Sequence, residues 1–342
     1  MNCKKETMHT NYIDYRDFLE LSEQYREKIF EFFTRDNLSD EETDSLYGLQ
    51  NLKPPEVTSV LIDDDFNTLH NLLKNMSDLT GLILIMSQNH VKHYGTGFIV
   101  KIRRQINGQC PCPDQESHNE LCTEHAIVTV STAYHIFSGE NETDVRRYKE
   151  IDGIWNEYKT QLKLYYNGDE DKSLEEIKEC TKFPTLYGHK LIEMDKDLDY
   201  DCDWCAIECV THDTKLIKKL EGTLSQYQSG LKELYNLSLT KYTDVDMVVI
   251  IGHPHNWSLR FSFGNTVCPN KEELKVIRSN QLWCRYYYDN LTCKGSSGSP
   301  IFKWGQSMSG FGYWFGHSHN HSEGNNEDEK GGKSTIGVEN IV

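Results

Sequence analysis

The stretch Lys294-Gly295-Ser296-Ser297-Gly298-Ser299-Pro300 bears more directly on the fold than any other part of this 342-residue chain. A serine flanked by glycines on a tight turn can present its hydroxyl at a surface. In such a turn the backbone N–H groups of Gly295 and Ser297 are candidates for an oxyanion hole, which stabilises negative charge in a transition state. By itself the stretch is equally compatible with a plain loop.

Two further motifs contain the partners that a nucleophilic serine needs. The sequence VSTAYH places His135 directly after a predicted strand, and DWCAI places Asp203 at the head of another. The serine needs a base to take its proton, and the base needs a carboxylate to orient it. His135, Asp203 and Ser297 follow one of the known chain orders for such triads. Asp199 and Asp201 are alternatives to Asp203, which we favour because the apolar stretch begins right after it. Without these partners, His135 would be interpreted as a structural histidine.

Taken together, these motifs resemble the trypsin/chymotrypsin-like serine peptidases. STAYH at 131–135 is similar to the family's T-A-x-H motif, and 295–300 is similar to its G-[DN]-S-G-G-P motif. The other similar segments are DWCAI at 203–207, GTGF at 95–98, and VVIIGHP at 248–254 with SFG at 262–264, the last pair matching the bacterial-type and glutamyl-endopeptidase branch. The resemblance covers about residues 79–315. A Cys-Pro-Cys…Cys insertion like that at 110–122 is also found in uncharacterised cytosolic invertebrate members.

The resemblance implies a fold and a set of roles. The expected fold is all-β, with two six-stranded antiparallel β-barrels of chymotrypsin type and a helical insertion between them. Ser297 is implied as the nucleophile, His135 as general base and then acid, and Asp203 as the orienting carboxylate. Gly295 and Ser297 are implied as the oxyanion hole. No cofactor is expected to be required for catalysis.

Three departures from the family pattern are informative. Ser296 stands where secreted members use an aspartate to bind a new N-terminus, so we predict no zymogen switch. Ile136 and Phe137 stand where those members carry a cysteine, which fits a reducing compartment. Ser299 replaces the second glycine of the serine motif, which restricts the backbone. This last change keeps open an inactive pseudopeptidase that acts as a protein-binding module.

The chain divides into an acidic helical extension over residues 1–76 and a peptidase-like domain over residues 77–342. Apolar residues at helical spacing predict a helix over 14–34, a capping box at Ser39 starts a second, and a third ends near Met76. We expect this α-helical N-terminal extension to be a possible surface for a protein partner.

Short β-rich runs predict strands in the remaining sequence. They lie at 82–87, 98–103, 126–131, 204–210, 247–252 and 311–315. The two barrels are expected at approximately 77–211 and 237–342, with a helical linker over 212–236. The segment 316–333, which contains His317, His319 and His321, is of low complexity, and we expect a mobile, solvated tail.

The resemblance also implies where the primary pocket lies. In this superfamily the residue six before the nucleophile lies near the base of that pocket, and here it is Leu291; Trp314 is also expected to line the pocket. An apolar residue at this position favours an apolar or aromatic side chain before the cut. The alternative is an acidic side chain recognised by a histidine, for which His317 is the candidate, and the sequence does not decide between them.

The 11 cysteines are an odd number, which cannot all pair within one chain. Cys202-x2-Cys205 has zinc-ligand spacing, and Cys110, Cys112 and Cys122 are candidates to complete a structural Zn²⁺ site with His118 or His125. Buried free thiols and disulfides are the alternatives.

Composition excludes several classes of function. The chain has 36 Lys and Arg against 53 Asp and Glu, a formal net charge of −17. This balance argues against nucleic-acid binding and against docking on an anionic membrane. The start of the chain has no apolar stretch, and no apolar run is long enough to span a bilayer. We therefore expect a cytoplasmic protein. The resemblance implies that it acts on a peptide or protein substrate. H-E-x-x-H, the motif of a metal-dependent hydrolase, is absent from the sequence.

Overall fold

The computed structural model describes residues 13–14, 63–87, 90–106, 111, 124–138, 158–167, 172–193, 202–242, 247–278, 281–304, 308–309, 318–324 and 330–340. These residues form mostly β-strands with few helices, as the sequence predicts. The predicted helices at 14–34 and after Ser39 lie outside the described residues, apart from Asp14. That residue belongs to strand β1 (Ile13–Asp14), not to a helix. The predicted strand at 311–315 also lies outside them, and the division between 76 and 77 stays a prediction.

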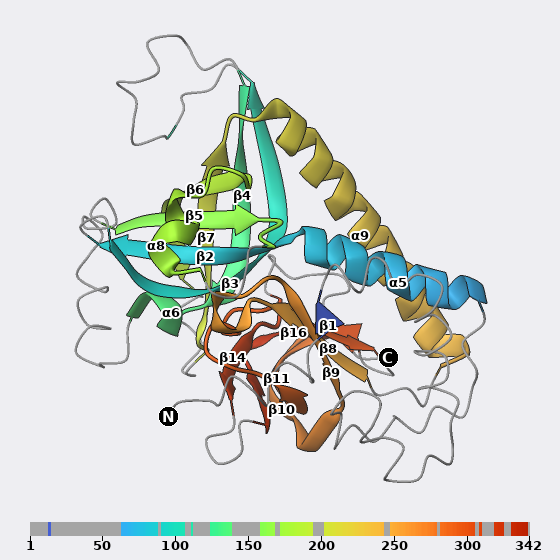
Figure 1. The fold of residues 1–342 in the computed structure, drawn as a ribbon. Helices are drawn as coiled ribbons and strands as arrows, with labels where there is room; N and C mark the ends of the chain where they lie inside the picture. Colours follow the sequence, from blue (N-terminus) through green and yellow to red (C-terminus); the bar gives the residue numbers. More distant parts are fainter. Residues whose placement is uncertain are drawn as a thin grey trace.

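Six strands close into an antiparallel barrel, seen in the upper part of Figure 1. They pair in the order β2-β3-β4-β7-β6-β5. Their bounds are β2 Thr80–Ser87, β3 His90–Ile106, β4 Glu124–Ala133, β5 Tyr158–Leu164, β6 Thr185–Glu193 and β7 Trp204–Thr211. Along β4, Ala126, Val128 and Val130 belong to the core, so the residues between them face outward. The first of the two predicted barrels is therefore present.

Strand β2 is apolar on both faces because both faces are covered. Ile83 and Ile85 face the barrel core. Leu82 and Leu84 pack instead with Tyr166, Ile177 and Phe183, beneath the short helix α8 (Leu174–Glu179). Ser173 and Glu176 form a capping box at the start of α8. Covering both faces explains why the sequence TGLILIMS does not alternate between apolar and polar residues.

The predicted helical linker is α9 (Thr214–Thr240), which extends four residues beyond the predicted end at 236. Asp213 caps it by accepting hydrogen bonds from the N–H groups of Lys215 and Leu216. Its buried residues recur every three or four positions: Leu216, Ile217, Leu220, Thr223, Tyr227, Leu231, Leu234 and Ser238.

Helix α5 (Asp63–Asp78), the predicted third helix, crosses α9 beside the barrel (Figure 1). Asp65 of α5 accepts hydrogen bonds from Lys241 and Tyr242 at the end of α9. The Tyr242 ring packs against Trp304, so the helix pair also contacts the C-terminal half. No helix among the described residues is both long and apolar enough to cross a membrane.

The prediction of a second six-stranded barrel is not confirmed. The C-terminal half contains two separate sheets, in the lower part of Figure 1. One has the order β1-β9-β8-β12, with β8 Met247–Gly252, β9 Arg260–Gly264 and β12 Ile301–Trp304. The other has the order β13-β16-β11-β15-β14, with β10 paired to β11; their bounds are β10 Thr266–Arg278, β11 Gln281–Leu291, β13 Met308–Ser309, β14 His321–Gly324, β15 Lys330–Ser334 and β16 Gly337–Asn340.

The reason for the open arrangement lies in β11. This strand pairs with β10 on one edge and with β15 and β16 on the other. Both edges are therefore occupied, and no ladder of the described residues joins β11 to β8 or β9. The two sheets connect through a bridge between Pro300 and Asn320 and through backbone bonds that flank it. These bonds lie next to the serine stretch.

Candidate active site

His135 is the first residue of α6 (His135–Ser138), directly beyond the end of β4. Its ring Nδ1 lies 2.7 Å from Oδ2 of Asp203, and its backbone N–H donates to Oδ1 at 2.9 Å. A carboxylate only accepts, so Nδ1 carries the proton and Nε2 is left to accept one. The imidazole is 42 % exposed and the carboxylate 12 %. The pair thus combines a sheltered carboxylate with an accessible base.

Asp203 is locked in place from several sides. It adopts a left-handed backbone with φ of 44°, a conformation that aspartate tolerates better than most residues. Its carbonyl accepts from the N–H of Tyr134 at 2.8 Å, and the hydroxyl of Ser322 donates to Oδ2. Burial acts to raise the pKa of Asp203, but the hydrogen bonds from His135 and Ser322 and the charge of His135 hold it below its ordinary value. Asp203 is therefore ionised at neutral pH. The alternatives Asp199 and Asp201 lie outside the described residues.

Ser297 lies on the loop between β11 and β12 and is held against β3. The N–H of Thr96 donates to the carbonyl of Ser297 at 2.8 Å. A Cβ placed on Gly95 would stand 2.9 Å from that carbonyl and 3.0 Å from Cγ2 of Ile136. Gly95 therefore has to be a glycine for the serine loop and the segment that begins with His135 to come this close. The half-buried Ser297 reaches the same end of the barrel as the His135–Asp203 pair.

The two expected oxyanion donors have fixed peptide orientations. The carbonyl of Lys294 accepts from the N–H of His255 at 2.6 Å, and the carbonyl of Ser296 accepts from the N–H of Ser299 at 2.9 Å. In a trans peptide the N–H points opposite to the carbonyl, so the N–H groups of Gly295 and Ser297 point away from these partners. Within the described part of the chain neither N–H donates to a protein acceptor.

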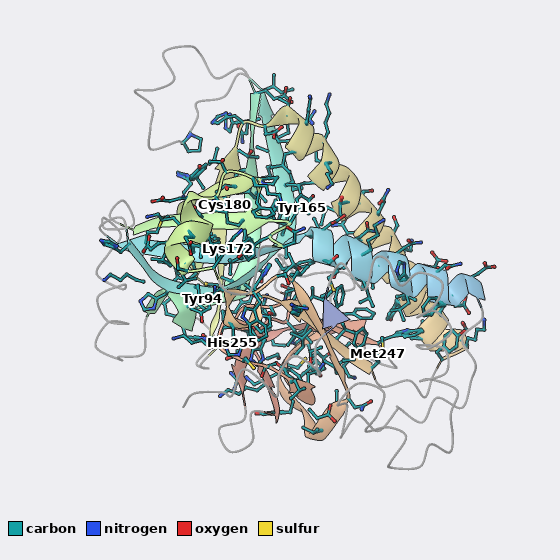
Figure 2. The ribbon with its side chains drawn as sticks, in the orientation of Figure 1. Tyr94, Tyr165, Lys172, Cys180, Met247 and His255 are labelled. Atoms are coloured by element: carbon teal, nitrogen blue, oxygen red, sulfur yellow. The ribbon has the colours of Figure 1, made fainter. Side chains whose placement is uncertain are left out.

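Gly295 also meets a requirement that no other residue satisfies without strain. Its φ is +96°, in the region that favours glycine. A Cβ there would stand 2.5 Å from the carbonyl oxygen of His253 and 2.8 Å from the ring of Tyr94. Figure 2 places Tyr94 and His255 close together where the barrel meets the C-terminal sheets. The Lys294 ammonium lies 5.8 Å from the centroid of the Tyr94 ring.

Thr96 connects the barrel to the serine loop through its side chain as well as its backbone. Its Oγ1 donates to the carbonyl of Gly295 at 2.9 Å and accepts from the N–H of His253 at 3.0 Å. Its own carbonyl accepts from Oγ1 of Thr132 at 2.7 Å. The sequence marked Thr96 only as part of a motif. The motif contains a hydroxyl residue, but nothing in it indicates that the hydroxyl bonds to Gly295.

The segment 318–322 is not a solvated tail, and that prediction is wrong over these residues. Residues 318–322 are all buried. Asn320 accepts from the hydroxyl of Ser131 at 2.6 Å and donates to the carbonyl of Gly298 at 2.7 Å, while Ser322 bonds to Asp203. The backbone pairs with the serine loop, which covers the segment on one side. The prediction from composition is wrong here because short polar side chains can hydrogen-bond to one another inside a protein as readily as they bind water.

The histidines of this segment are neutral. His319 lies with its ring centroid 4.3 Å from that of Tyr286, and His321 Nδ1 lies 2.7 Å from the hydroxyl of Tyr288. Burial lowers the pKa of His319 and of His321 to about 3 each. Because both rings are buried, neither can chelate a metal ion from the solvent. His317 lies outside the described residues.

The predicted pocket is described only in part. Leu291 is the last residue of β11 and is half-buried. Trp314 lies outside the described residues. The buried His321 bonds through its backbone to Gly298 and Ser299. Its place beside the serine loop was not predicted, because the composition of 316–333 resembles that of a tail.

The residues predicted to bind zinc do not all lie at one place in the structure. Cys110, Cys112, Cys122 and His118 lie outside the described residues. Cys205 pairs with Thr132, whereas His125 directly precedes Ala126, which pairs with Thr211. Six residues of strand separate these levels, roughly 20 Å, so one ion cannot bind both Cys205 and His125. A site that combines Cys202 and Cys205 with His125 is therefore wrong.

Six cysteines form no disulfide bond: Cys180, Cys202, Cys205, Cys209, Cys284 and Cys293. Burial raises the pKa of the Cys209 thiol far above its ordinary value, which makes it unreactive. Among the described residues no cluster of three or more histidine, cysteine or acidic side chains is arranged to hold a metal ion.

No family model matches the chain, and no curated protein matches it. Among solved structures it is similar to the serine endoprotease from Yersinia pestis, with 11 % identity, a TM-score of 0.35 and coverage of 78 % of this chain and 61 % of that one. The chain thus spans less than two thirds of that protein.

Two structures of Rv3671c from M. tuberculosis are also similar. An inactive mutant form has 10 % identity, a TM-score of 0.35 and coverage of 84 % of this chain and 89 % of that one. The active form of the Rv3671c protease has 11 % identity, a TM-score of 0.34 and coverage of 78 % of each chain. TM-scores this low add nothing to what the geometry supports. None of the three is an invertebrate protein, so the resemblance to invertebrate members has no support among them.

Proposed function

We propose that this chain is a serine endopeptidase that hydrolyses peptide bonds through His135, Asp203 and Ser297. The observation that carries the proposal is the 2.7 Å contact between His135 Nδ1 and Asp203 Oδ2, at the end of the barrel where Thr96 holds the backbone of Ser297. A buried, ionised carboxylate that fixes the tautomer of an accessible imidazole is what a general base requires.

The proposed reaction has two halves. Nε2 of His135 removes the proton from Oγ of Ser297, which attacks the carbonyl carbon of the substrate. The N–H groups of Gly295 and Ser297 bind the negative oxygen of the tetrahedral intermediate. The C–N bond then breaks, the amine leaves with the proton from Nε2, and the acyl group remains on Oγ as an ester. Water attacks this ester with His135 again as base, which releases the acid and restores the hydroxyl.

Asp203 stabilises the imidazolium that forms in each half. Its carboxylate stays ionised because His135 and Ser322 both donate to it. The backbone bonds to Tyr134 and His135 prevent the carboxylate from turning away. Asp203 is thus proposed as an orienting and charge-stabilising group that exchanges no proton with the substrate.

The preferred side chain before the cut is proposed to be apolar or aromatic because of Leu291. The alternative, an acidic side chain, would be recognised by a histidine of the site. Competing p-nitroanilide peptides with Phe, Leu, Glu and Arg at that position would measure the preference. Cleavage after Arg alone would contradict both. The enzyme is also proposed to act in the cytoplasm. This location fits the six cysteines that form no disulfide bond.

The test is hydrolysis of an internally quenched peptide library by the purified full chain, with an ester substrate to detect a burst. We expect turnover and a burst in the wild type and neither in Ser297→Ala or His135→Ala. Ser299→Ala, in the same loop, is the matched control and should keep turnover. Turnover by Ser297→Ala equal to that of the wild type, or no turnover by a folded wild type, would overturn the proposal.

A further inference from the structure

His125 is buried although it lies on the outward-facing side of strand β4. The neighbouring core residues of β4 alternate, with Ala126 and Val128 facing inward, so His125 faces out of the barrel. It is nevertheless only 1 % exposed, and among the residues that the structure describes neither Nδ1 nor Nε2 has a hydrogen-bond partner. Leaving a buried polar group unsatisfied usually destabilises a fold. Two unsatisfied nitrogens on one ring therefore call for a ligand.

A second imidazole lies directly across the ladder. Ala126 pairs with Thr211, so the same register places His212 opposite His125, just past the end of β7. Opposite residues of an antiparallel pair project to the same face. The two ring centroids are 5.8 Å apart and the rings are inclined by 53°. Two imidazoles bound to one tetrahedral zinc ion, with Zn–N bonds of about 2 Å, have centroids roughly 5 Å apart.

The surrounding charges allow a cation at this position. The two guanidinium groups on the neighbouring part of β3 are both neutralised, because Arg103 pairs with Glu208 and Arg104 pairs with Glu124 and Glu221. The two imidazoles lie at the end of the barrel where the β3–β4 hairpin approaches the start of α9, far from His135 (Figure 1).

We propose that His125 and His212 bind one structural Zn²⁺ ion at this end of the barrel. Zinc is favoured among the divalent ions because imidazole nitrogens suit it. The proposed ligands are the two imidazoles. This site excludes Cys205, which is at the other end of the ladder, and it does not depend on the proposed peptidase activity.

The test measures zinc bound to the purified full chain by mass spectrometry of the metal, followed by titration with a chromophoric chelator. We expect one zinc ion per chain in the wild type. His125→Asn and His212→Asn should each weaken zinc binding by about a hundredfold or more, because loss of an outer-shell partner alone costs 10- to 100-fold. His90→Asn is the control, since His90 is exposed at the opposite end of β3 and should leave binding unchanged.

Cobalt substitution gives an independent readout if His125→Asn does not fold. His212 is half-buried at the surface, so His212→Asn keeps the test open. Tetrahedral Co²⁺ bands that disappear in this variant support the site, whether or not a thiolate charge-transfer band accompanies them. Adding Zn²⁺ to the metal-free chain should also raise the melting temperature of the wild type more than that of His212→Asn. No bound zinc in the wild type, or binding unchanged in both variants, would overturn the proposal.

Discussion

The two halves of the molecule hold their parts of the candidate site by different means. In the barrel, β4 and β7 are neighbours, and the pairing of Ala133 with Trp204 brings His135 and Asp203 together. Their contacts involve side chains, and each is sensitive to the identity of the residue. In the C-terminal half, Ser297 is placed by backbone bonds and by a glycine with positive φ. We therefore expect the barrel side to respond to changes of charge and hydrogen bonding, and the serine loop to changes of backbone freedom.

The strongest test of the barrel side is Asp203→Asn. The amide cannot stabilise an imidazolium and favours the wrong tautomer of His135, so kcat should fall about 10⁴-fold with KM little changed. Steady-state kinetics on the best peptide would measure this. Asp213→Asn keeps the helix cap of α9 and should leave kcat unaltered. A decrease of less than tenfold in Asp203→Asn would break the comparison, because the carboxylate would then not act through His135.

Gly295→Ala tests the serine loop in the same assay. The added Cβ conflicts with the carbonyl of His253 and with φ of +96°, so the peptide before it must rotate and its N–H leaves the site. Removal of one oxyanion donor typically lowers kcat about 10²- to 10³-fold. Gly222→Ala is the control, since nothing lies within 4 Å of its Cβ position in α9, and it should stabilise the fold slightly. Full activity in Gly295→Ala would show that backbone freedom does not matter here.

The neutral histidines predict how stability depends on pH. His319 has a folded pKa of about 3 against 6.5 when unfolded, so protons bind preferentially to the unfolded chain between these values. Its contribution to stability is complete above pH 6.5 and decreases as the pH falls. At pH 5 the loss is about 2 kcal/mol for this residue. Urea unfolding of the wild type and His319→Gln at pH 7 and pH 5 should show a smaller loss in the variant by about that amount. Equal losses would contradict a buried, neutral His319.

Thr96 joins the two halves, and its substitution should have the smallest effect. Thr96→Val keeps the shape and the backbone bond to Ser297 but removes the hydrogen bond that Oγ1 donates to Gly295 and the one it accepts from the N–H of His253. A neutral hydrogen bond contributes about 0.5–1.5 kcal/mol, so kcat should fall up to about tenfold with KM nearly constant. Thr96→Ser should restore kcat, which a purely structural role in packing would not predict. If both variants lower kcat equally, the hydroxyl does not position the loop.

The sequence predicts four of the six barrel strands because apolar, β-rich runs mark them, whereas β5 and β6 carry no such run and are not predicted. The apolar runs at 82–87, 126–131 and 204–210 all lie inside strands of the barrel, and Leu216 to Leu234 lie in α9. His135 and Asp203 were identified because each adjoins a strong strand pattern. Candidate catalytic residues that directly adjoin a strand can therefore be found from the sequence.

The C-terminal half was harder to predict because its contacts are irregular. The open sheets arise from the pairing of both edges of β11, and no local sequence signal specifies that choice. Ser322 and Asn320 reach Asp203 and Gly298 from a segment whose composition resembles a linker. Likewise, the pairing of His125 with His212 depends on strand register, which composition and spacing do not reveal.

The central claim is that the serine loop of the C-terminal half places Ser297 at the His135–Asp203 pair of the barrel. The most direct measurement is to treat the folded full chain with a fluorophosphonate and map the adduct by peptide mass spectrometry. Three serines lie close together in the loop, at 296, 297 and 299, so the position of the adduct is decisive. We predict a single phosphonylated residue, Ser297, in the wild type and no adduct in His135→Ala. An adduct on another serine, or one that forms equally well in His135→Ala, would contradict the claim.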